Sequence, residues 1–210
     1  MAEPGLRERK KQRVRAAISE AAITLFQESG FDGVTVAEIA AAAEVSKPTL
    51  FAYFPSKEDL VLHRFIDHED EPARVVRGRE PGVPPLAALR RNFLDGLDRR
   101  DPVTGLNDTP QVLVFHNLLY STPALITRLT AYMLRAESAL ADALAEAAPG
   151  DEIAPLVAAA QIFGTQRVLG DRNVRDMRAG RGADDVHPEA AARAEAAFDL
   201  LERGLAPRFG

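Results

Sequence analysis

The chain has 210 residues, of which 46% are hydrophobic and 27% charged, and its net charge is −5. This length suffices for one large or two small domains with a substantial core. The absence of cysteine excludes disulfide bonds and thiolate metal sites. No apolar run approaches a membrane span and no signal-peptide core follows the N-terminus, so we expect a cytoplasmic protein without membrane contact.

The charge is distributed unevenly along the chain. Residues 1–15 carry a net charge of +4, which leaves −9 for the remainder. The basic residues of this segment are Arg7, Arg9, Lys10, Lys11, Arg13 and Arg15, and the acidic ones are Glu3 and Glu8. A basic end on an acidic protein favours phosphate contact there and discourages nonspecific adhesion elsewhere. Taken alone, the segment could equally be a frayed, solubilising terminus.

A first helix is predicted from the basic segment to about Gly30. Apolar residues recur at helical spacing from Val14 to Phe26, and the pattern stops at Ser29 and Gly30. We expect this helix to be the scaffold against which the next two helices pack.

The segment 35–57 predicts two short helices joined by a tight turn at residues 43–45. Thr35 can cap the first helix while Glu38 reaches back to the amide of the cap, as in a capping box. Val34 and Ile39 occupy the two positions of a hydrophobic staple, which fixes how the chain enters the helix.

The second short helix has a clear start and two different faces. Ser46 is its predicted cap, and Pro48 falls in the first turn, where a missing amide costs little. Leu50 and Phe54 point toward the core at i and i+4. The residues off that stripe are Lys47, Pro48, Phe51 and Tyr53. Two large exposed aromatic side chains are unusual on an ordinary surface helix.

The run VSKPTLFAYFPSKEDL resembles the recognition helix of TetR-family transcriptional regulators, whose common form is close to V-S-x-x-T-L-Y-x-Y-F-x-S-K-E-x-L. The resemblance covers about residues 10–65 and includes the preceding run TLFQESGFDGVTVAEIA. Two positions depart from the family pattern: Phe51 replaces the usual Tyr, and Pro48 stands where Gly or a polar residue is common. Because Phe51 has no hydroxyl, it would contact DNA by packing against sugar or a thymine methyl group.

The resemblance implies an all-α protein with a helix-turn-helix DNA-binding domain at residues 1–55 and a helical ligand-binding and dimerisation domain at residues 56–210. From their placement on the recognition helix, the candidates for contact with base edges are Lys47, Pro48 and Phe51. The residues that match phosphate-binding positions of the family are Thr35, Thr49, Tyr53 and Lys57. Thr35 could also be a simple cap, and Lys57 a solvated surface lysine.

The rest of the chain is also predicted to be helical, with no period-2 strand pattern. A connecting helix follows Ser56, and residues 77–85 are rich in glycine and proline and predict a loop. The further helices are expected at about residues 86–97, 110–120, 123–147, 152–178 and 188–205. Two Thr-Pro pairs mark the starts at residues 110 and 123.

The last two helices mix small and large apolar residues, which permits close helix packing. The family resemblance implies that they pair with their copies in a dimer. The predicted interface residues are Val157, Ala160, Gly164, Val168, Ala194, Phe198 and Leu201. The alternative is an ordinary core within one chain. A dimer also suits DNA recognition, because one short recognition helix reads only a few base pairs.

The middle helices are more apolar than a spacer requires, which fits a ligand cavity. The candidate lining residues are Phe93, Leu97, Phe115, His116, Leu119, Tyr120, Met133, Phe163 and Arg167. For the apolar members, ordinary core is the alternative. Arg167 could neutralise an acidic ligand or form an ion pair between subunits.

Together these features predict a homodimeric repressor that a small-molecule effector releases from a palindromic operator in double-stranded DNA, with no cofactor. One alternative is a helical ligand-binding or interaction protein without DNA binding. Another is a metal-dependent enzyme with His63, Asp67 and His68 as ligands. The chain has no G-x-S-x-G, H-E-x-x-H or glycine-rich phosphate-loop motif, so we predict that it is not an enzyme.

Overall fold

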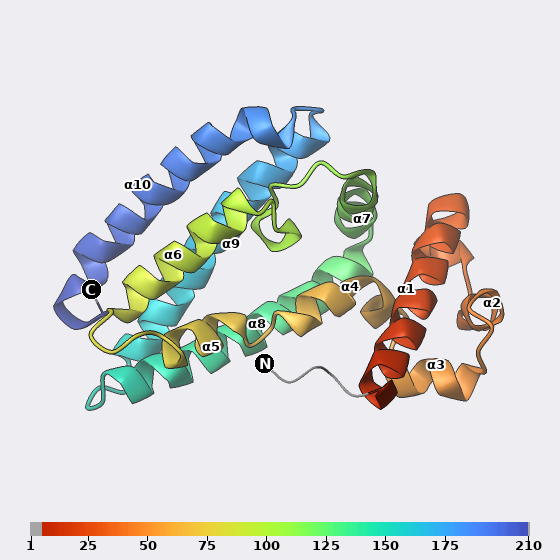
Figure 1. Ribbon diagram of the computed structural model, residues 1–210, viewed down its shortest axis with the longest axis horizontal. Coiled ribbons are helices and arrows are strands. Elements are labelled where there is room, and N and C mark those ends of the chain that lie inside the picture. Colours follow the sequence, from red (N-terminus) through yellow and green to blue (C-terminus); the bar gives the residue numbers. More distant parts are fainter. Residues whose placement is uncertain (1–5, 210) are drawn as a thin grey trace. The chain divides into compact units, whose positions relative to one another are not determined.

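The computed structural model describes residues 6–209, and within them the side chains of residues 9–63 and 68–204. Helices account for most of this part of the chain, and it contains no strand, so the all-α prediction is confirmed. The elements are α1 (Leu6–Gly33), α2 (Val36–Ala42), α3 (Lys47–Tyr53), α4 (Lys57–Asp67), α5 (Glu71–Arg77), α6 (Pro85–Asp98), the 3₁₀ turn η1 (Pro102–Thr104), α7 (Pro110–Ser121), α8 (Pro123–Ala147), α9 (Ala154–Arg178) and α10 (Ala183–Phe209) (Figure 1). None of the helices in the described ranges is long and apolar enough to cross a membrane.

The chain forms two compact units. The first contains the residues up to Arg64 together with Val114–Leu129, and the second contains Phe65–Leu113 and the residues from Thr130 onward. Residues 114–129 belong to the region that the sequence assigns to the C-terminal domain, yet they group with the N-terminal helices.

In the first unit, α1 is interrupted at Gly30, where the backbone takes φ 74° and ψ 162°. Such positive φ values suit glycine, so the interruption falls where the sequence predicts the end of the helix. The first unit has an apolar core built from α1 to α4, and its large, fully buried side chains include Ile18, Phe26, Ile39, Leu50, Phe54, Leu60 and Leu62.

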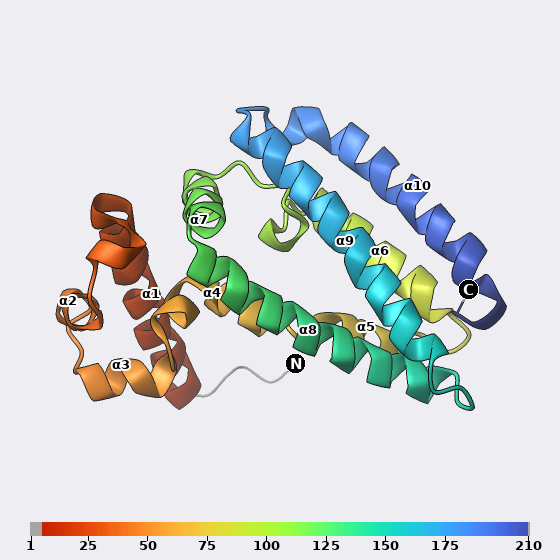
Figure 2. The same ribbon diagram turned by 180° about the vertical axis from the view of Figure 1, so that it is seen from behind.

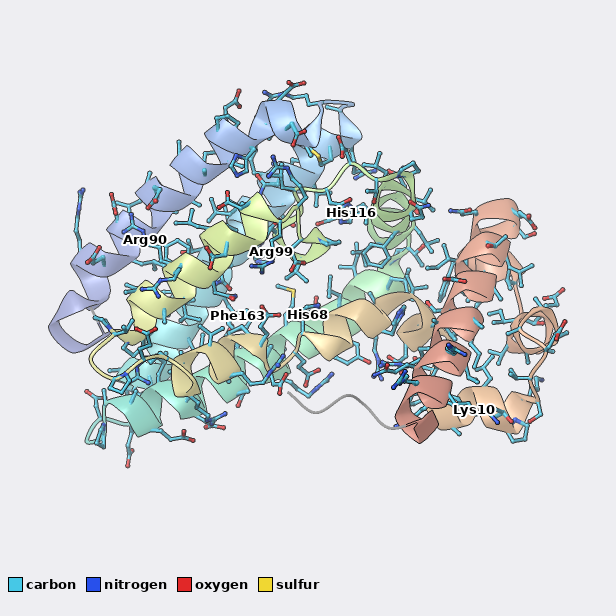
Figure 3. The ribbon with its side chains drawn as sticks, in the orientation of Figure 1. Lys10, His68, Arg90, Arg99, His116 and Phe163 are labelled. Carbon is cyan, nitrogen blue, oxygen red and sulfur yellow. The ribbon has the colours of Figure 1, made fainter. Side chains whose placement is uncertain are left out.

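In the second unit, α6, α9 and α10 lie side by side, as both views show (Figures 1 and 2). Their core includes Leu89, Leu97, Ile162, Val186 and Phe198. Outside this core, Arg90 of α6 bonds to carboxylates of α10 (Figure 3): it contacts Glu195, and its Nη1 lies 2.9 Å from Asp199.

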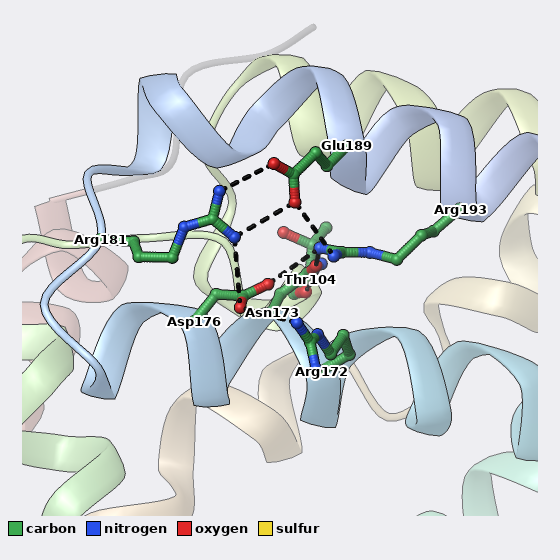
Figure 4. A network of polar contacts seen from close by, with 7 residues as sticks. All are labelled: Thr104, Arg172, Asn173, Asp176, Arg181, Glu189 and Arg193. Carbon is green, nitrogen blue, oxygen red and sulfur yellow. Dashed lines mark hydrogen bonds and ion pairs between the residues drawn. The ribbon is translucent and has the colours of Figure 1, made fainter.

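A polar network joins α9 to α10 and to η1 (Figure 4). Asp176 is 5% exposed, and its carboxylate is paired with Arg172, Arg181 and Arg193 at 3.2, 3.4 and 3.1 Å. Asn173 donates a hydrogen bond of 2.9 Å to the carbonyl of Thr104. These contacts satisfy polar groups that would otherwise be costly to bury.

One helix and one helix start differ from the sequence prediction. Helix α5 was not predicted, although Pro72 in its first turn is a common helix start. Helix α10 begins at Ala183, five residues before the expected start. Asp184 and Asp185 lie in its first turn, where acidic side chains interact favourably with the helix dipole. Helices α6, α7 and α8 lie where predicted.

Candidate nucleic-acid interface

Helix α2 begins with the predicted capping box. The Thr35 hydroxyl accepts a hydrogen bond from the Glu38 amide at 3.3 Å, and the Glu38 carboxylate accepts from the Thr35 amide at 2.7 Å. The hydrogen bond from the Thr35 backbone, followed by that from its hydroxyl, lowers the pKa of Glu38. Val34 and Ile39 are both buried, as the staple requires. The start of α2 is therefore fixed by local contacts.

The turn and the next cap also match the prediction. Glu44 takes a φ of 53°, which reverses the chain after α2. Ser46 then caps α3 by accepting a hydrogen bond from the Thr49 amide at 3.2 Å, and Pro48 occupies the second helical position. Helices α2 and α3 thus form a helix-turn-helix whose two starts are both capped.

Helix α3 buries one face and exposes the other. Leu50 and Phe54 are 0% and 1% exposed in the core. Lys47 and Pro48 are exposed, and 46% of Phe51 is exposed. The three candidates for base contact therefore share the solvent side of the helix. Lys47 has no hydrogen-bond or ion-pair partner within the described part of the chain.

The four candidates for phosphate contact differ in their surroundings. Thr35 is exposed at the start of α2, while Thr49 and Tyr53 are half-buried. The Thr49 hydroxyl is hydrogen-bonded to that of Ser46 at 2.7 Å. Lys57 donates a hydrogen bond to the Phe31 carbonyl within its own unit.

The basic segment is helical from Leu6 onward because α1 begins there. Arg9, Lys10, Lys11 and Arg13 are exposed, and Figure 3 labels Lys10 on this helix. The guanidinium of Arg15 instead lies 5.6 Å from the centre of the Phe54 ring. Arg7, Glu3 and Glu8 lie outside the described side chains. The described basic residues place positive charge on the first turns of α1.

Helix α4 is attached to α1 by a buried polar contact. Ser19 is 3% exposed, and its hydroxyl donates to the Leu60 carbonyl at 3.1 Å. The same hydroxyl lies 3.1 Å from Nδ1 of His63, whose ring packs edge-on against Phe54. The core of the helix-turn-helix and the start of α4 therefore share one set of contacts.

The second unit has an open cleft of about 620 Å³ along α5 and α6. Its lining residues are His68, Glu71, Arg74, Val75, Gly78, Arg79, Glu80, Val83, Ala88, Arg91, Asn92 and Asp95. Glu71 is hydrogen-bonded by His68 and by Asn92, the latter at 3.2 Å. Desolvation is the largest single effect and raises the pKa of Glu71, but the two hydrogen bonds and the charge interactions with His68 and Arg74 together lower this pKa below its ordinary value. The sequence does not predict this cleft, because half of its twelve lining residues are charged and only three are apolar.

The residues predicted to bind a ligand are divided between the two units. Phe115, His116, Leu119 and Tyr120 belong to the first unit, and Phe93, Leu97, Met133, Phe163 and Arg167 to the second. Phe93 and Leu97 lie in the core of the second unit, and Phe163 packs against it (Figure 3). Arg167 is exposed and pairs with Asp171 at 3.4 Å. None of the nine residues lines the cleft along α5 and α6.

The residues predicted to form the dimer interface fall into two groups. On α9, Val157 and Val168 are 46% and 59% exposed, Ala160 is exposed and Gly164 is half-buried. On α10, Ala194, Phe198 and Leu201 lie in the core of the second unit. The exposed apolar face of α10 is instead formed by Ala192, Ala196 and Leu200.

The described residues hold no group of three or more histidine, aspartate or glutamate side chains that could bind a metal ion. His63 contacts Ser19, and His68 contacts Glu71. The third candidate ligand, Asp67, has a side chain outside the described set.

Two capped helices joined by a tight turn, the second with a solvent-facing lysine and aromatic residue, define a helix-turn-helix DNA-binding module. Residues 18–63 match the sequence model of the bacterial regulatory proteins of the tetR family. The chain is therefore similar to this family over its helix-turn-helix and the helices on either side of it, where its recognition-helix motif predicts the likeness.

A relative in sequence matches a longer part of the chain. The chain is 33% identical over 135 residues to the HTH-type transcriptional regulator TcmR of Streptomyces glaucescens, and the match covers 64% of this chain and 58% of TcmR. It therefore spans less than two thirds of the length of this relative.

The fold extends over nearly the whole chain. NalD of Pseudomonas aeruginosa, described as the secondary repressor of the MexAB-OprM multidrug efflux pump, superposes with a TM-score of 0.57 at 19% identity, covering 92% of this chain and 96% of NalD. A complex of SmeT with triclosan superposes with a TM-score of 0.54 at 17% identity, covering 91% of each chain.

Proposed function

We propose that this protein is a cytoplasmic, homodimeric repressor that binds a palindromic DNA operator and is released from it by a small-molecule effector. It acts by binding and not by catalysis. The observation that carries the proposal is the solvent-facing side of α3, where Lys47, Pro48 and Phe51 stand on a helix whose start is capped. A rigid helix with such a face can enter the major groove and contact base edges.

The exposed basic residues of α1 also support DNA binding, because of their positive charge. Arg9, Lys10, Lys11 and Arg13 lie in the same unit as α3. Positive charge near a recognition helix supplies sequence-independent attraction to phosphate, which dominates nucleic-acid affinity at low salt. The acidic remainder of the chain would keep this attraction local.

The apolar surface of the second unit supports a homodimer. Leu156, Val157 and Val168 of α9 are 55%, 46% and 59% exposed, and Leu200 of α10 is 68% exposed. Ala160 of α9 and Ala192 and Ala196 of α10 are also exposed and would let two helices approach closely. A second copy of the chain is the natural partner, because two linked recognition helices are needed to read a palindrome.

The small-molecule effector is proposed from the second unit and from the fold relatives. The cleft along α5 and α6 has a volume within the range typical of ligand sites. SmeT has been captured with triclosan, and NalD is described as a repressor. An effector would have to bind the DNA-free form more tightly than the DNA-bound form, since equal affinity shifts no equilibrium.

Footprinting on the DNA upstream of the protein's own coding region tests the DNA-binding proposal. We expect protection of two half-sites about one helical turn apart or more, and loss of protection with Phe51→Glu. The matched control is Val103→Glu, a change at a 45% exposed apolar residue of the second unit, which should protect the same bases as the unaltered protein. Equal binding to all fragments, or none, would contradict the proposal.

Sedimentation equilibrium tests the dimer. The pair Val157→Glu and Leu200→Glu should convert the protein to a monomer, because charges would then be desolvated at an apolar interface. Leu134→Glu, at a 62% exposed leucine of α8, is the matched control and should remain dimeric. A protein that is monomeric without any substitution, yet binds its operator tightly and selectively, would overturn the proposed assembly.

A further inference from the structure

The cleft along α5 and α6 is walled by one face of each helix. On α5 and the residues after it, the lining residues recur at helical spacing from Glu71 to Arg79, and on α6 they do so from Ala88 to Asp95. The two helices pack against each other, and Asn92 donates a hydrogen bond of 3.2 Å to Glu71. The cleft therefore lies entirely within the second unit.

The two ends of this cleft differ in charge. Glu71 is at the start of α5, and its carboxylate already accepts hydrogen bonds from His68 and Asn92. Arg79 follows the other end of α5, a helix of seven residues that is about 10 Å long. Val75 lies between them in the chain and also lines the cleft. An apolar stretch therefore separates a carboxylate that already has donors from a cationic end.

Arg79 is a half-buried cation that no carboxylate neutralises among the described residues. Its Nε donates to the Val83 carbonyl at 2.9 Å, and its Nη1 donates to the Val76 carbonyl at 2.6 Å. A guanidinium has five N–H donors, so these two bonds leave three, including both on Nη2. The carbonyls hold the guanidinium in place but are uncharged. Its positive charge and its remaining donors are therefore available to an anion.

The other charged residues of the cleft are more exposed than Arg79. The Arg74 side chain is 59% exposed and is paired with Asp70 at 3.1 Å. The remaining exposed ones are Glu80, Arg91 and Asp95. Water and salt screen exposed charges, whereas a half-buried guanidinium interacts more strongly with an opposite charge. Arg79 is therefore the charged group of the cleft that an anionic ligand would contact most favourably.

We propose that this cleft binds a small anion with an apolar group, a carboxylate or a phosphate ester, whose negative group is bound by the remaining donors of Arg79. The apolar group then lies along Val75 and Ala88. The planar fork of an arginine suits either anion, because two parallel N–H groups match two of its oxygens. This inference rests on the proposed effector and names its chemical class.

The first test titrates the unaltered protein with hexanoate, hexyl phosphate, hexan-1-ol and hexylammonium. Nuclear magnetic resonance of the methyl groups of Val75, Val83 and Ala88 reports binding in the cleft. We expect one of the two anions to bind at least about tenfold more tightly than hexan-1-ol, the size of one hydrogen bond to a charged group. The tighter anion distinguishes a carboxylate from a phosphate ligand. Failure of both anions to shift these resonances, or equal or tighter binding of hexan-1-ol or hexylammonium, would overturn the proposal.

The second test removes the charge of Arg79. Arg79→Gln should weaken binding of the preferred anion about tenfold or more and leave binding of hexan-1-ol unchanged. The matched control is Arg77→Gln, which removes the same charge at an exposed residue of α5 that pairs with Glu146 and does not line the cleft. The control should bind the anion as the unaltered protein does. Equal losses would mean that the overall charge of α5 attracts the anion, and would overturn the proposal.

A further pair of variants leaves the Arg79 side chain in place, because Arg79→Gln also removes hydrogen bonds to the loop after α5. Ala88→Glu introduces a carboxylate into the lining of the cleft and should abolish anion binding by charge repulsion. Ala87→Glu is the matched control, since Ala87 is exposed on the same helix and does not line the cleft. Equal anion binding by these two variants would overturn the proposal.

Release of the operator separates this inference from the proposed function. In an electrophoretic mobility assay, the preferred anion should release DNA from the unaltered protein at concentrations that fill the cleft, and should not release it from Arg79→Gln. An anion that fills the cleft without changing operator affinity would support the anion site and contradict the effector role of the cleft. Intact operator binding by a protein that binds neither anion would overturn the anion site and leave the DNA-binding proposal standing.

Discussion

The carboxylate of Asp59 accepts two hydrogen bonds from the guanidinium of Arg128, at 3.0 and 3.1 Å. Asp59 is 1% exposed, whereas the Arg128 side chain is 40% exposed. The Asp59 amide also bonds to the Ser56 hydroxyl at 3.2 Å, so Asp59 belongs to the first turn of α4. This two-point contact ties α8 to the start of α4 within the first unit.

Arg128→Ala should destabilise the protein by about 3 kcal/mol, because it deprives a buried carboxylate of its bidentate partner. Urea unfolding followed by circular dichroism measures the change. The control is Arg135→Ala, which breaks a more exposed pair with Glu69 and should cost less than about 1 kcal/mol. Equal losses of unfolding free energy from the two substitutions would show that the burial of Asp59 does not decide how much the ion pair contributes to stability.

Lys47→Ala should change which base is preferred at one position of each half-site. A lysine that contacts a base edge contributes about 1–3 kcal/mol of discrimination, and its loss relaxes the preference at that position. Selection from a randomised operator library measures the preference. Tyr53→Ala, at a predicted phosphate contact, should instead weaken binding to all sequences alike. A uniform loss from Lys47→Ala would contradict its role in base reading.

Local signals explain how much of this site could be predicted. The caps at Thr35 and Ser46 depend on residues three positions away, so their partners are visible in the sequence. The partners of Lys57 and Asp59 are not visible, because Phe31 lies 26 residues from Lys57 and Arg128 lies 69 residues from Asp59. Motif spacing locates such residues but does not give the tertiary contacts that decide their chemistry.

In the second unit, the sequence does not predict which face of α10 is exposed. Helix α10 carries apolar residues on two sides, and the sequence alone favoured Ala194, Phe198 and Leu201 as its interface. These residues are in the core, while Ala192, Ala196 and Leu200 are exposed. In an alanine-rich helix both sides have nearly the same apolar pattern, so periodicity cannot distinguish the inner face from the outer one.

Replacing Glu38 with Gln should remove a pH-dependent part of the stability. The hydrogen bonds from Thr35 lower the pKa of Glu38 from its ordinary value of 4.5, so the charged form favours the folded state. This contribution is complete above pH 4.5 and is lost as the pH falls through the lowered pKa. The unaltered protein and Glu38→Gln should therefore differ in unfolding free energy at pH 7, and urea titrations at each pH should show this difference shrinking as the pH falls through the lowered pKa of Glu38. A difference in unfolding free energy that stays constant from neutral to acidic pH would contradict the stabilising role of the ionised Glu38 carboxylate.

Gly105→Ala should destabilise the second unit by more than the cost of placing an alanine at a positive φ. Gly105 has a φ of 74°, and a Cβ atom there would lie 2.4 Å from the Gly170 carbonyl oxygen and 2.9 Å from a methyl group of Val174. Gly82→Ala is the matched control, because Gly82 has a φ of 84° but nothing within 4 Å of the added atom. The control should cost about 1 kcal/mol for its backbone conformation, and Gly105→Ala at least about 2 kcal/mol more for the forced separation of η1 from α9. Thermal and urea unfolding of both variants measures the difference, and equal losses would show that the contact between Gly105 and Gly170 relaxes without cost.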